Sequence, residues 1–181
     1  MTPRSADLVH AVVAYDDTAR SFLLRAKLGR RPELLSPLGR QLARALEVAD
    51  LARGCTALAV VPSHPVATLR RGFSPARELA RPVARLFGLP LRGALIKRRL
   101  RAGGPVKRLS ARSRRRALRD AFVVRDRLPG CRVLLIDDVM TTGETVAACA
   151  RALKGAGALE VRVAVWARTL PPHWGGLSSN V

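Results

Sequence analysis

Apolar residues recur at helical spacing in some segments of this chain and in unbroken runs in others, and the two patterns predict different elements. Between residues 17 and 49, leucine and alanine recur every three or four positions, which is typical of an amphipathic helix. Four helix-breaking residues interrupt the pattern: Gly29, Pro32, Pro37 and Gly39. The segment therefore predicts two helices, preceded by a short and mostly apolar stretch at residues 10–15.

Unbroken apolar runs at residues 57–61, 132–136 and 161–166 predict strands that are buried on both faces. Residues 144–154, between the last two runs, have helical spacing and are followed by a glycine-rich end. A strand, a helix and a second strand in this order form a βαβ unit with parallel strands and a right-handed crossover. The pattern thus predicts an α/β fold, in which helices cover both faces of a mainly parallel sheet.

Residues 74–88 predict one more helix, with Ser74 as N-cap, Pro75 in the first turn and Gly88 at the end. Pro82 lies inside this pattern, where a proline removes a backbone hydrogen bond. The helix is therefore expected to kink at this residue or to start later. Two shorter strands are predicted at residues 91–96 and 121–124.

Length and composition limit the class of protein. The 181 residues suffice for one domain of ordinary size, and 48% apolar with 25% charged residues is typical of a folded domain. We expect a cytoplasmic protein with no membrane span, because the sequence has no apolar run of the required length and no secretion signal. Three widely spaced cysteines, Cys55, Cys131 and Cys149, indicate neither a disulfide framework nor a zinc site.

The charge is strongly positive, with 33 lysines and arginines against 13 acidic residues and a net charge of +20. Such a field attracts polyanions, and charge alone does not separate phosphorylated small molecules from nucleic acid. Residues 97–119 hold eleven lysines and arginines, two adjacent glycines and no aromatic residue. We interpret them as a basic loop that leads into a short helix near residues 109–118.

Candidate chemistry gathers in residues 137–145, which follow a predicted buried strand and open a predicted helix. This is the place where α/β sheets bind ligands. Backbone N–H groups at the helix start, threonine hydroxyls and a glycine form a nest for a phosphate dianion. Asp137 and Asp138, just ahead of the nest, suit vicinal sugar hydroxyls and help to hold Mg²⁺. A 5-phosphorylated ribose satisfies both halves. The alternative is an acidic, threonine-rich helix cap without a ligand.

The stretch from Val133 to Thr145 resembles the phosphoribosyl diphosphate (PRPP) signature of type I phosphoribosyltransferases. Further segments resemble one branch of these proteins, the competence protein F (ComF) family, and the chain is identified as a member of it. The segments are Val61-Pro62, His64-Pro65, Arg70 to Ser74, Ala76 to Gly88, Leu109-Ser110, Arg114 to Arg116 and Ala121-Phe122, and the start from Ala14-Tyr15 through Lys27 is similar to the segment that precedes this domain in the family. The likeness spans roughly Val12 to Arg168.

This resemblance implies the type I phosphoribosyltransferase fold, with a small N-terminal helical hood. It divides the chain into a hood at residues 1–55, a phosphoribosyltransferase core at 56–170 and a flexible tail at 171–181. Members of the family often carry an N-terminal four-cysteine zinc finger, which this sequence lacks. The sequence also departs from many relatives at Val106-Lys107, where they have a glutamine, and at Ala117, where they have an asparagine.

The resemblance also implies a binding site. Asp137 and Asp138 would bind the ribose hydroxyls and serve as the catalytic pair. The PRPP-binding loop would add Thr141, Thr142, Gly143 and Thr145 around the 5-phosphate, with Glu144 beginning the helix. On the diphosphate side the candidates are Ser63, His64, Arg71, Lys107 and Arg108. His64 is alternatively a simple loop residue, and residues 97–108 are alternatively a solvated basic loop; no direct metal ligand is assigned.

Two functions remain open at this stage. The resemblance implies Mg²⁺-dependent binding of PRPP, transfer of phosphoribose to or from an unidentified nitrogenous base, and a link to the competence machinery of DNA uptake. The alternative is a non-catalytic accessory or regulatory protein that binds single-stranded DNA through its basic surface. Because residues 97–119 lack aromatic side chains for stacking, such binding would be mainly to phosphates. The two functions can coexist.

Overall fold

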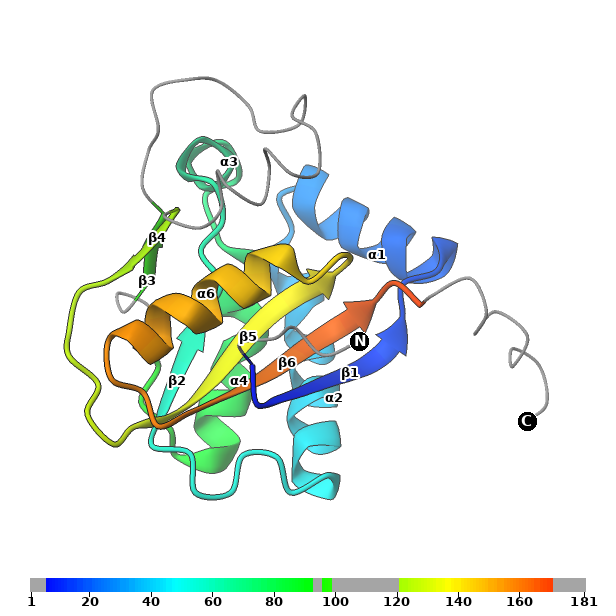
Figure 1. The fold of residues 1–181 in the computed structure, drawn as a ribbon. Coiled ribbons are helices and arrows are strands. Elements are labelled where there is room, and N and C mark those ends of the chain that lie inside the picture. The colour runs from blue at the N-terminus through cyan, green and yellow to red at the C-terminus, as the bar shows by residue number, and fades with distance from the viewer. Residues whose placement is uncertain (1–5, 93–95, 99–120, 171–181) are drawn as a thin grey trace.

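A four-stranded sheet forms the centre of the structure, a computed structural model that describes residues 6–92, 96–98 and 121–170 (Figure 1). Its strands are all parallel and stand in the order β1-β6-β5-β2. They are β1 (Leu8–Ala14), β6 (Glu160–Arg168), β5 (Arg132–Met140) and β2 (Ala57–Val60). The three predicted buried runs are thus confirmed as neighbouring strands of a parallel sheet.

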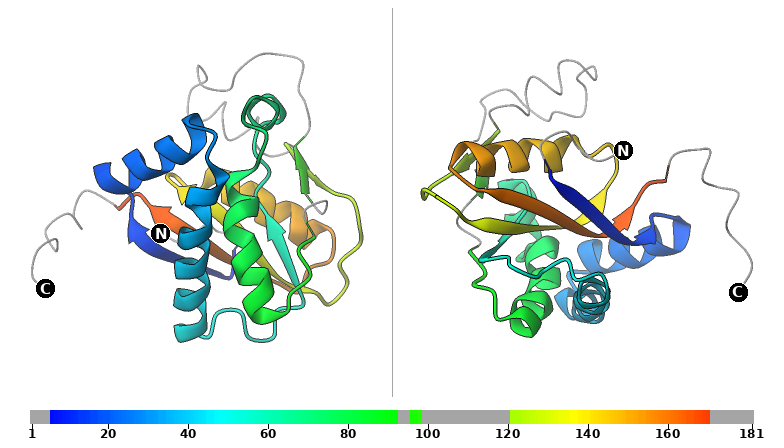
Figure 2. Two further views of the ribbon diagram at one scale, coloured as in Figure 1. Left: turned by 180° about the vertical axis from the view of Figure 1, so that it is seen from behind. Right: turned by 60° about the horizontal axis from the view of Figure 1, so that its bottom comes forward.

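Helices cover both faces of this sheet (Figure 2). On one face lie α1 (Asp17–Leu28), α2 (Leu35–Val48) and α4 (Pro75–Phe87), and on the other lies α6 (Glu144–Gly155). Leu134 and Ile136 of β5 pack into the core beneath the first three helices, whereas Val133 and Leu135 pack into the core beneath α6. All four side chains are fully buried, which explains the unbroken apolar run.

Smaller elements connect or flank these layers. They are the 3-10 turn η1 (Pro32–Leu34), helix α3 (Pro65–Arg71), and the antiparallel pair β3 (Ile96–Arg98) and β4 (Phe122–Val124). The predicted strand at 91–96 is described only at its two ends, where Leu91 bridges to Leu58 and β3 begins. The predicted helix near 109–118 and the tail at 171–181 lie outside the described residues. No described helix has the length and apolar character needed to cross a bilayer.

The two predicted helices between residues 17 and 49 are confirmed, but two of the predicted breakers lie inside α2. Pro37 occupies its first turn, where a proline is tolerated. Gly39 lies where α4 approaches most closely, because a Cβ atom there would be 2.8 Å from the carbonyl oxygen of Leu79 and 2.9 Å from Cγ of Pro82. Gly39 thus permits helix packing rather than ending a helix. The later start expected for α4 because of Pro82 is wrong, since the helix begins at Pro75.

Strand β5 extends further than the sequence predicted. Asp137 and Asp138, which we expected in a turn, belong to the strand, and pairing with β6 continues to the register pair Met140 and Arg168. Val139 and Met140 are partly and fully buried, respectively, so the burial of apolar side chains continues past the two acids. The turn is therefore limited to residues 141–143, and both aspartates lie on strand β5.

Strand β1 comes from the segment that we assigned to the N-terminal hood. It pairs with β6 from Leu8 to Ala14 and forms one edge of the sheet among the described residues. Helix α1 follows with almost no connecting loop. The N–H of Tyr15 still bonds to the carbonyl of Arg168 in β6, at 2.8 Å, and the next residue, Asp16, already caps the helix. The strand thereby places α1 at the end of the sheet toward which the strands point (Figure 1).

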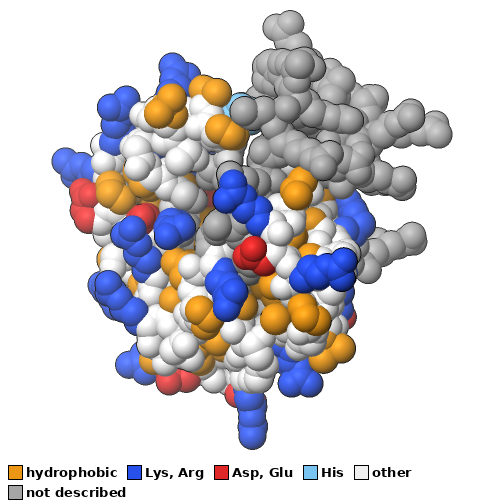
Figure 3. Space-filling view, turned by 90° about the vertical axis from the view of Figure 1, so that its left-hand side faces the viewer, with side chains coloured by type: hydrophobic (Ala, Val, Ile, Leu, Met, Phe, Trp, Pro, Cys, Tyr) orange, Lys and Arg blue, Asp and Glu red, His pale blue; other side chains and the backbone are white. Residues whose placement is uncertain are grey.

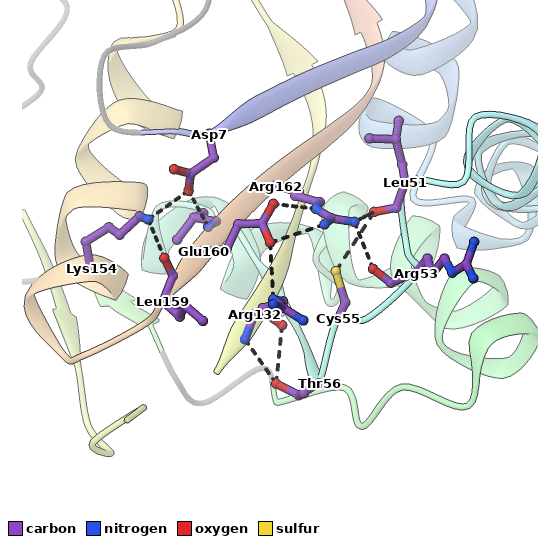
Figure 4. A network of polar contacts seen from close by, with 11 residues as sticks. Asp7, Leu51, Arg53, Cys55, Thr56, Arg132, Lys154, Leu159, Glu160 and Arg162 are labelled. Carbon is purple, nitrogen blue, oxygen red and sulfur yellow. Dashed lines mark hydrogen bonds and ion pairs between the residues drawn. The ribbon is translucent and has the colours of Figure 1, made fainter. Parts of the chain in front are cut away.

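A polar network joins the amino ends of the strands, opposite the turn at residues 141–143 (Figure 4). The Arg162 guanidinium donates to the Glu160 carboxylate at 2.7 and 3.1 Å. It also donates to the carbonyls of Leu51 and Arg53 at 3.1 and 2.9 Å, in the loop that follows α2. Arg162 thus ties that loop to the start of β6.

We expect Arg162→Met to lower the free energy of unfolding by about 1–3 kcal/mol, because two carbonyl groups and a carboxylate lose the hydrogen bonds that Arg162 donates. Urea denaturation measures the change. The matched control is Arg53→Met, whose side chain makes an exposed ion pair with Asp50 at 3.3 Å and should cost far less. Equal unfolding midpoints for the two variants would contradict the role assigned to Arg162.

Candidate functional site

The turn between β5 and α6 has the backbone features of an anion site. Gly143 is the N-cap residue of α6 and adopts left-handed angles, φ 74° and ψ 0°, that suit glycine. Its carbonyl accepts the N–H of Ala147 at 2.8 Å, which starts the helix. The first N–H groups of a helix have no acceptor within it, and Gly143 provides no side chain to cap them. The helix start is thus suited to an anionic ligand.

The side chains on the two sides of Gly143 differ in their exposure to solvent. Thr141 and Thr142 are exposed, whereas Glu144 and Thr145 are half-buried at the first turn of α6. The predicted PRPP-binding loop therefore presents two hydroxyl groups to solvent beside the start of the helix. Its assignment to the 5-phosphate stays a prediction.

Among the described residues, Asp137 is the only one with an ionisable acidic or basic side chain that is buried, with 9% of its surface exposed. Its Oδ1 accepts the backbone N–H of Asp138 at 2.9 Å. Burial raises the pKa of the Asp137 carboxyl well above its ordinary value, and the negative charge of Asp138 raises it further. The N–H of Asp138 and the positive charge of Lys27 offset this only in part. Asp137 therefore keeps its proton to a higher pH than an exposed aspartate.

The Asp138 carboxylate forms an ion pair with a lysine that sequence reasoning gave no role. Lys27 Nζ, from α1, contacts Asp138 Oδ2. That oxygen is shielded from solvent and has no hydrogen-bond partner among the described residues, so the ammonium is its compensating group. The contact joins the N-terminal helix to the carboxyl end of β5.

The helical pattern contained a signal for Lys27. Helix α1 buries Ala19, Leu23 and Ala26, and Lys27 lies four residues after Leu23, at the border of this buried stripe. A lysine at such a position needs a carboxylate partner if its charge is to be retained. The sequence did not show which carboxylate this is.

This arrangement removes an electrostatic conflict. Two ionised carboxylates immediately before a phosphate nest would repel the ligand. Burial instead favours the neutral form of Asp137, and Lys27 balances the charge of Asp138. The acidic pair can then lie beside an anion site without a net charge of −2.

Two predicted diphosphate-side residues lie in the chain segment that follows β2. The N–H of Val61 bonds to the carbonyl of Ile136 at 2.9 Å, so Ser63 and His64 leave the sheet next to the acidic end of β5. His64 is exposed, and its Nδ1 accepts the N–H of Val66 at 3.3 Å, as the cap of α3. This capping role agrees with the alternative of a loop residue; a ligand role for His64 stays a prediction.

The other diphosphate-side candidates are arginines and a lysine. Arg71 is half-buried, and its Nε donates to the carbonyl of Ala67 in the same short helix, at 3.0 Å. Lys107 and Arg108 lie outside the described residues. All three therefore stay predictions for this side of the site.

The donor atoms that the acidic pair offers a metal ion are carboxyl oxygens. Within residues 6–92, 96–98 and 121–170, no three histidine, cysteine, aspartate or glutamate side chains are grouped so as to hold a metal. Mg²⁺ commonly takes one or two carboxylates together with the phosphates of its substrate. Asp137 and Asp138 therefore suit an ion that arrives with a phosphorylated ligand.

Residues 37–170 match the family described as "Phosphoribosyl transferase domain". The chain belongs to this family. The match includes all of α2 but its first two residues, the whole of β5 and the turn before α6, and it confirms the type I phosphoribosyltransferase fold expected from the sequence. It does not include α1 or Lys27.

Curated relatives place the phosphoribosyl transferase chain in the ComF branch. It is 36% identical to DNA utilization protein YhgH of Salmonella typhi over 150 residues, which are 80% of this chain and 64% of that protein. It is 34% identical to YhgH of Escherichia coli K12 over 165 residues, 88% of this chain and 71% of that protein. Identity to Competence protein F of Haemophilus influenzae is 33% over 110 residues, 59% of this chain and 48% of that protein. The chain thus spans less than two thirds of the Salmonella relative.

The raised pKa of Asp137 predicts that Asp137→Asn stabilises the fold at neutral pH. Stability contributed by the protonated carboxyl is complete below the ordinary pKa of 3.8 and is lost as pH rises through the raised folded value. Asparagine keeps the acceptor for Asp138 N–H and never ionises. We expect a gain on the order of 1 kcal/mol at pH 7, about 2–4 °C in Tm, that shrinks toward pH 4.

Thermal unfolding between pH 4 and pH 8 measures this difference. Asp126→Asn is the matched control, because Asp126 is exposed. A wild-type protein that is as stable as Asp137→Asn at every pH would show that Asp137 is not held in its neutral form.

Proposed function

We propose that this chain binds PRPP with Mg²⁺ at residues 137–145 and transfers phosphoribose to or from a nitrogenous base. One observation carries the proposal. A buried strand ends in two adjacent carboxyl groups, and a left-handed glycine without a capping side chain then starts a helix. The two parts suit opposite ends of a 5-phosphorylated ribose.

The helix end of the site would hold the 5-phosphate. The N–H groups of the first turn of α6 donate to phosphate oxygens, and the helix dipole favours the negative charge. Thr141 and Thr142, both exposed, add hydroxyl donors at the mouth of the site. Gly143 allows the phosphate to approach the backbone closely, because it has no Cβ atom.

The strand end of the site would hold the sugar. Adjacent carboxyl groups can accept hydrogen bonds from the vicinal 2- and 3-hydroxyls of a ribose. Pairing with β6 fixes the backbone of both acids, because Asp137 pairs with Val165 and Val139, just after Asp138, pairs with Ala167. The sugar is thereby oriented relative to the phosphate before any reaction.

Transfer would pass through a state with positive charge on the ribose and a departing diphosphate. The Asp138 carboxylate, next to the sugar, would stabilise the positive charge. Asp138 would also hold a Mg²⁺ ion arriving with PRPP, joined by Asp137 once the ion displaces the proton of that carboxyl group, and this ion would neutralise charge on the diphosphate. The acceptor base is not specified by any described residue.

A second candidate function is binding of single-stranded DNA, which the overall charge of +20 favours. On the face shown in Figure 3, lysine and arginine side chains are spread among apolar groups and few acidic ones. Two of the relatives are named for DNA utilization and competence. We propose that DNA, if bound, contacts these side chains through its phosphates, and that this chain acts with the competence machinery.

The PRPP site is tested by a pair of glycine variants. Gly143→Ala and Gly130→Ala introduce a side chain at nearly equal positive φ angles, 74° and 70°, so both should lose about 1–2 kcal/mol of stability. Only Gly143 belongs to the proposed nest. Calorimetry with PRPP and Mg²⁺ should show an affinity at least ~10-fold weaker for Gly143→Ala, through lost phosphate hydrogen bonds, and unchanged for Gly130→Ala.

The proposed site would be contradicted if the wild-type protein gave no heat of binding with PRPP and Mg²⁺, or if the two glycine variants bound PRPP with equal affinity. Asp137→Ala should also weaken binding while leaving the protein folded. Transfer is a separate question, and a turnover assay with a panel of bases addresses it.

DNA binding, if present, is expected to depend steeply on salt. A polyanion held by many lysine and arginine contacts should lose on the order of 100-fold or more in affinity between 50 and 200 mM salt. Fluorescence anisotropy with a labelled single strand measures this. Affinity that persists at ~0.5 M salt would show that contacts other than phosphate contacts hold the DNA.

A further inference from the structure

Among the described residues, Lys27 brings a positive charge to the acidic pair from a helix outside the sheet. Helix α1 carries it, and this helix precedes the residues that match the phosphoribosyl transferase domain. Strand β1 and the short connection at Tyr15 hold α1 at the carboxyl end of the sheet (Figures 1 and 2). The fold therefore fixes the backbone position from which the Lys27 side chain extends.

The contact covers an atom that the proposed ligand needs. Asp138 Oδ2 is shielded from solvent, and Lys27 Nζ is its ion-pair partner. A ribose hydroxyl cannot reach this oxygen until the ammonium leaves. The Lys27 side chain keeps 24% of its surface exposed, against 15% for Asp138, so one side of it is open to water. Rotation of its four-carbon stem can withdraw the ammonium without movement of α1.

We propose that, when the site fills, the Lys27 ammonium exchanges partners: it moves away from Asp138 and binds the diphosphate of PRPP instead. The proposal rests on the function proposed above. In the empty site the ammonium balances the charge of Asp138. When the ribose hydroxyls bind Asp138, the ammonium needs another anion, and the diphosphate on C1 lies next to the 2-hydroxyl. Lys27 thus acts as a diphosphate-binding residue supplied by the N-terminal helix.

The exchange distinguishes two ligands that share a sugar and a 5-phosphate. PRPP offers Lys27 a new anion, whereas ribose 5-phosphate displaces the ammonium and offers none. A lysine that only anchors α1 would affect both ligands alike. The comparison of the two ligands therefore separates the exchange from a purely structural ion pair.

Calorimetry with each ligand and Mg²⁺ is performed on wild type, Lys27→Met, Lys27→Arg and Arg25→Met. For Lys27→Met we expect an affinity for PRPP that is about 10-fold weaker or more, and an affinity for ribose 5-phosphate that is unchanged or stronger. Lys27→Arg should keep most of the affinity for PRPP. Arg25→Met removes the same charge from an exposed position of the same helix and should leave both affinities unchanged.

A second readout follows the ammonium itself in the wild-type protein. Acetylation of lysines by acetic anhydride, mapped by peptide mass spectrometry, should be faster at Lys27 with ribose 5-phosphate bound than in the empty protein. With PRPP bound, Lys27 should be protected. Asp138→Asn should expose Lys27 without any ligand, and Lys154, paired with Asp7 at 2.8 Å, serves as the internal reference.

The outcomes are separable. Wild-type protein that binds neither ligand overturns the proposed function, and the exchange falls with it. Binding by the wild type with equal losses for both ligands in Lys27→Met, or with no loss for PRPP, overturns the exchange alone. Lys27 that is acetylated equally in the empty, PRPP-bound and ribose 5-phosphate-bound protein also overturns it.

Discussion

Two adjacent carboxyl groups at the end of a strand buried on both faces cannot both be ionised without compensation, and the rest of the site follows from this constraint. Burial favours the neutral form of Asp137, and the ammonium of Lys27 balances Asp138. The lysine can reach the strand only because β1 joins the sheet and leads directly into α1. An N-terminal strand, a helix and the acidic end of the central strand thus form one electrostatic unit.

The fold was predictable where side chains alone decide the structure. The runs at 57–61, 132–136 and 161–166 became strands because apolar residues without polar interruption have to be buried on both sides. The predictions were wrong where contact with another strand or helix decides the local structure. Two acids indicate a turn, yet pairing with β6 carries β5 to Met140. Gly39 indicates a helix end, yet the close approach of α4 explains it.

The candidate site was predictable to the extent that it is contiguous in sequence. Residues 137–145 form one segment, and the left-handed glycine at its centre follows from the need for a close turn. The pairing of Lys27 with Asp138 depends on a contact between distant segments that no spacing along the chain reveals. The buried stripe of α1 marked Lys27 as unusual for a lysine, but only the folded chain identifies Asp138 as its partner.

The place of β1 at the sheet margin also bears on how the domain can be dissected. A fragment cut to residues 37–170, the stretch that matches the phosphoribosyl transferase family, would lack β1 and leave one side of β6 without its ladder partner. Between Arg162 and Arg168, the backbone groups of β6 that now bond to β1 would then be open to other molecules. Exposed strand edges of this kind promote intermolecular strand pairing and aggregation. A stable fragment is therefore expected to begin at β1, before residue 37, where the family match starts.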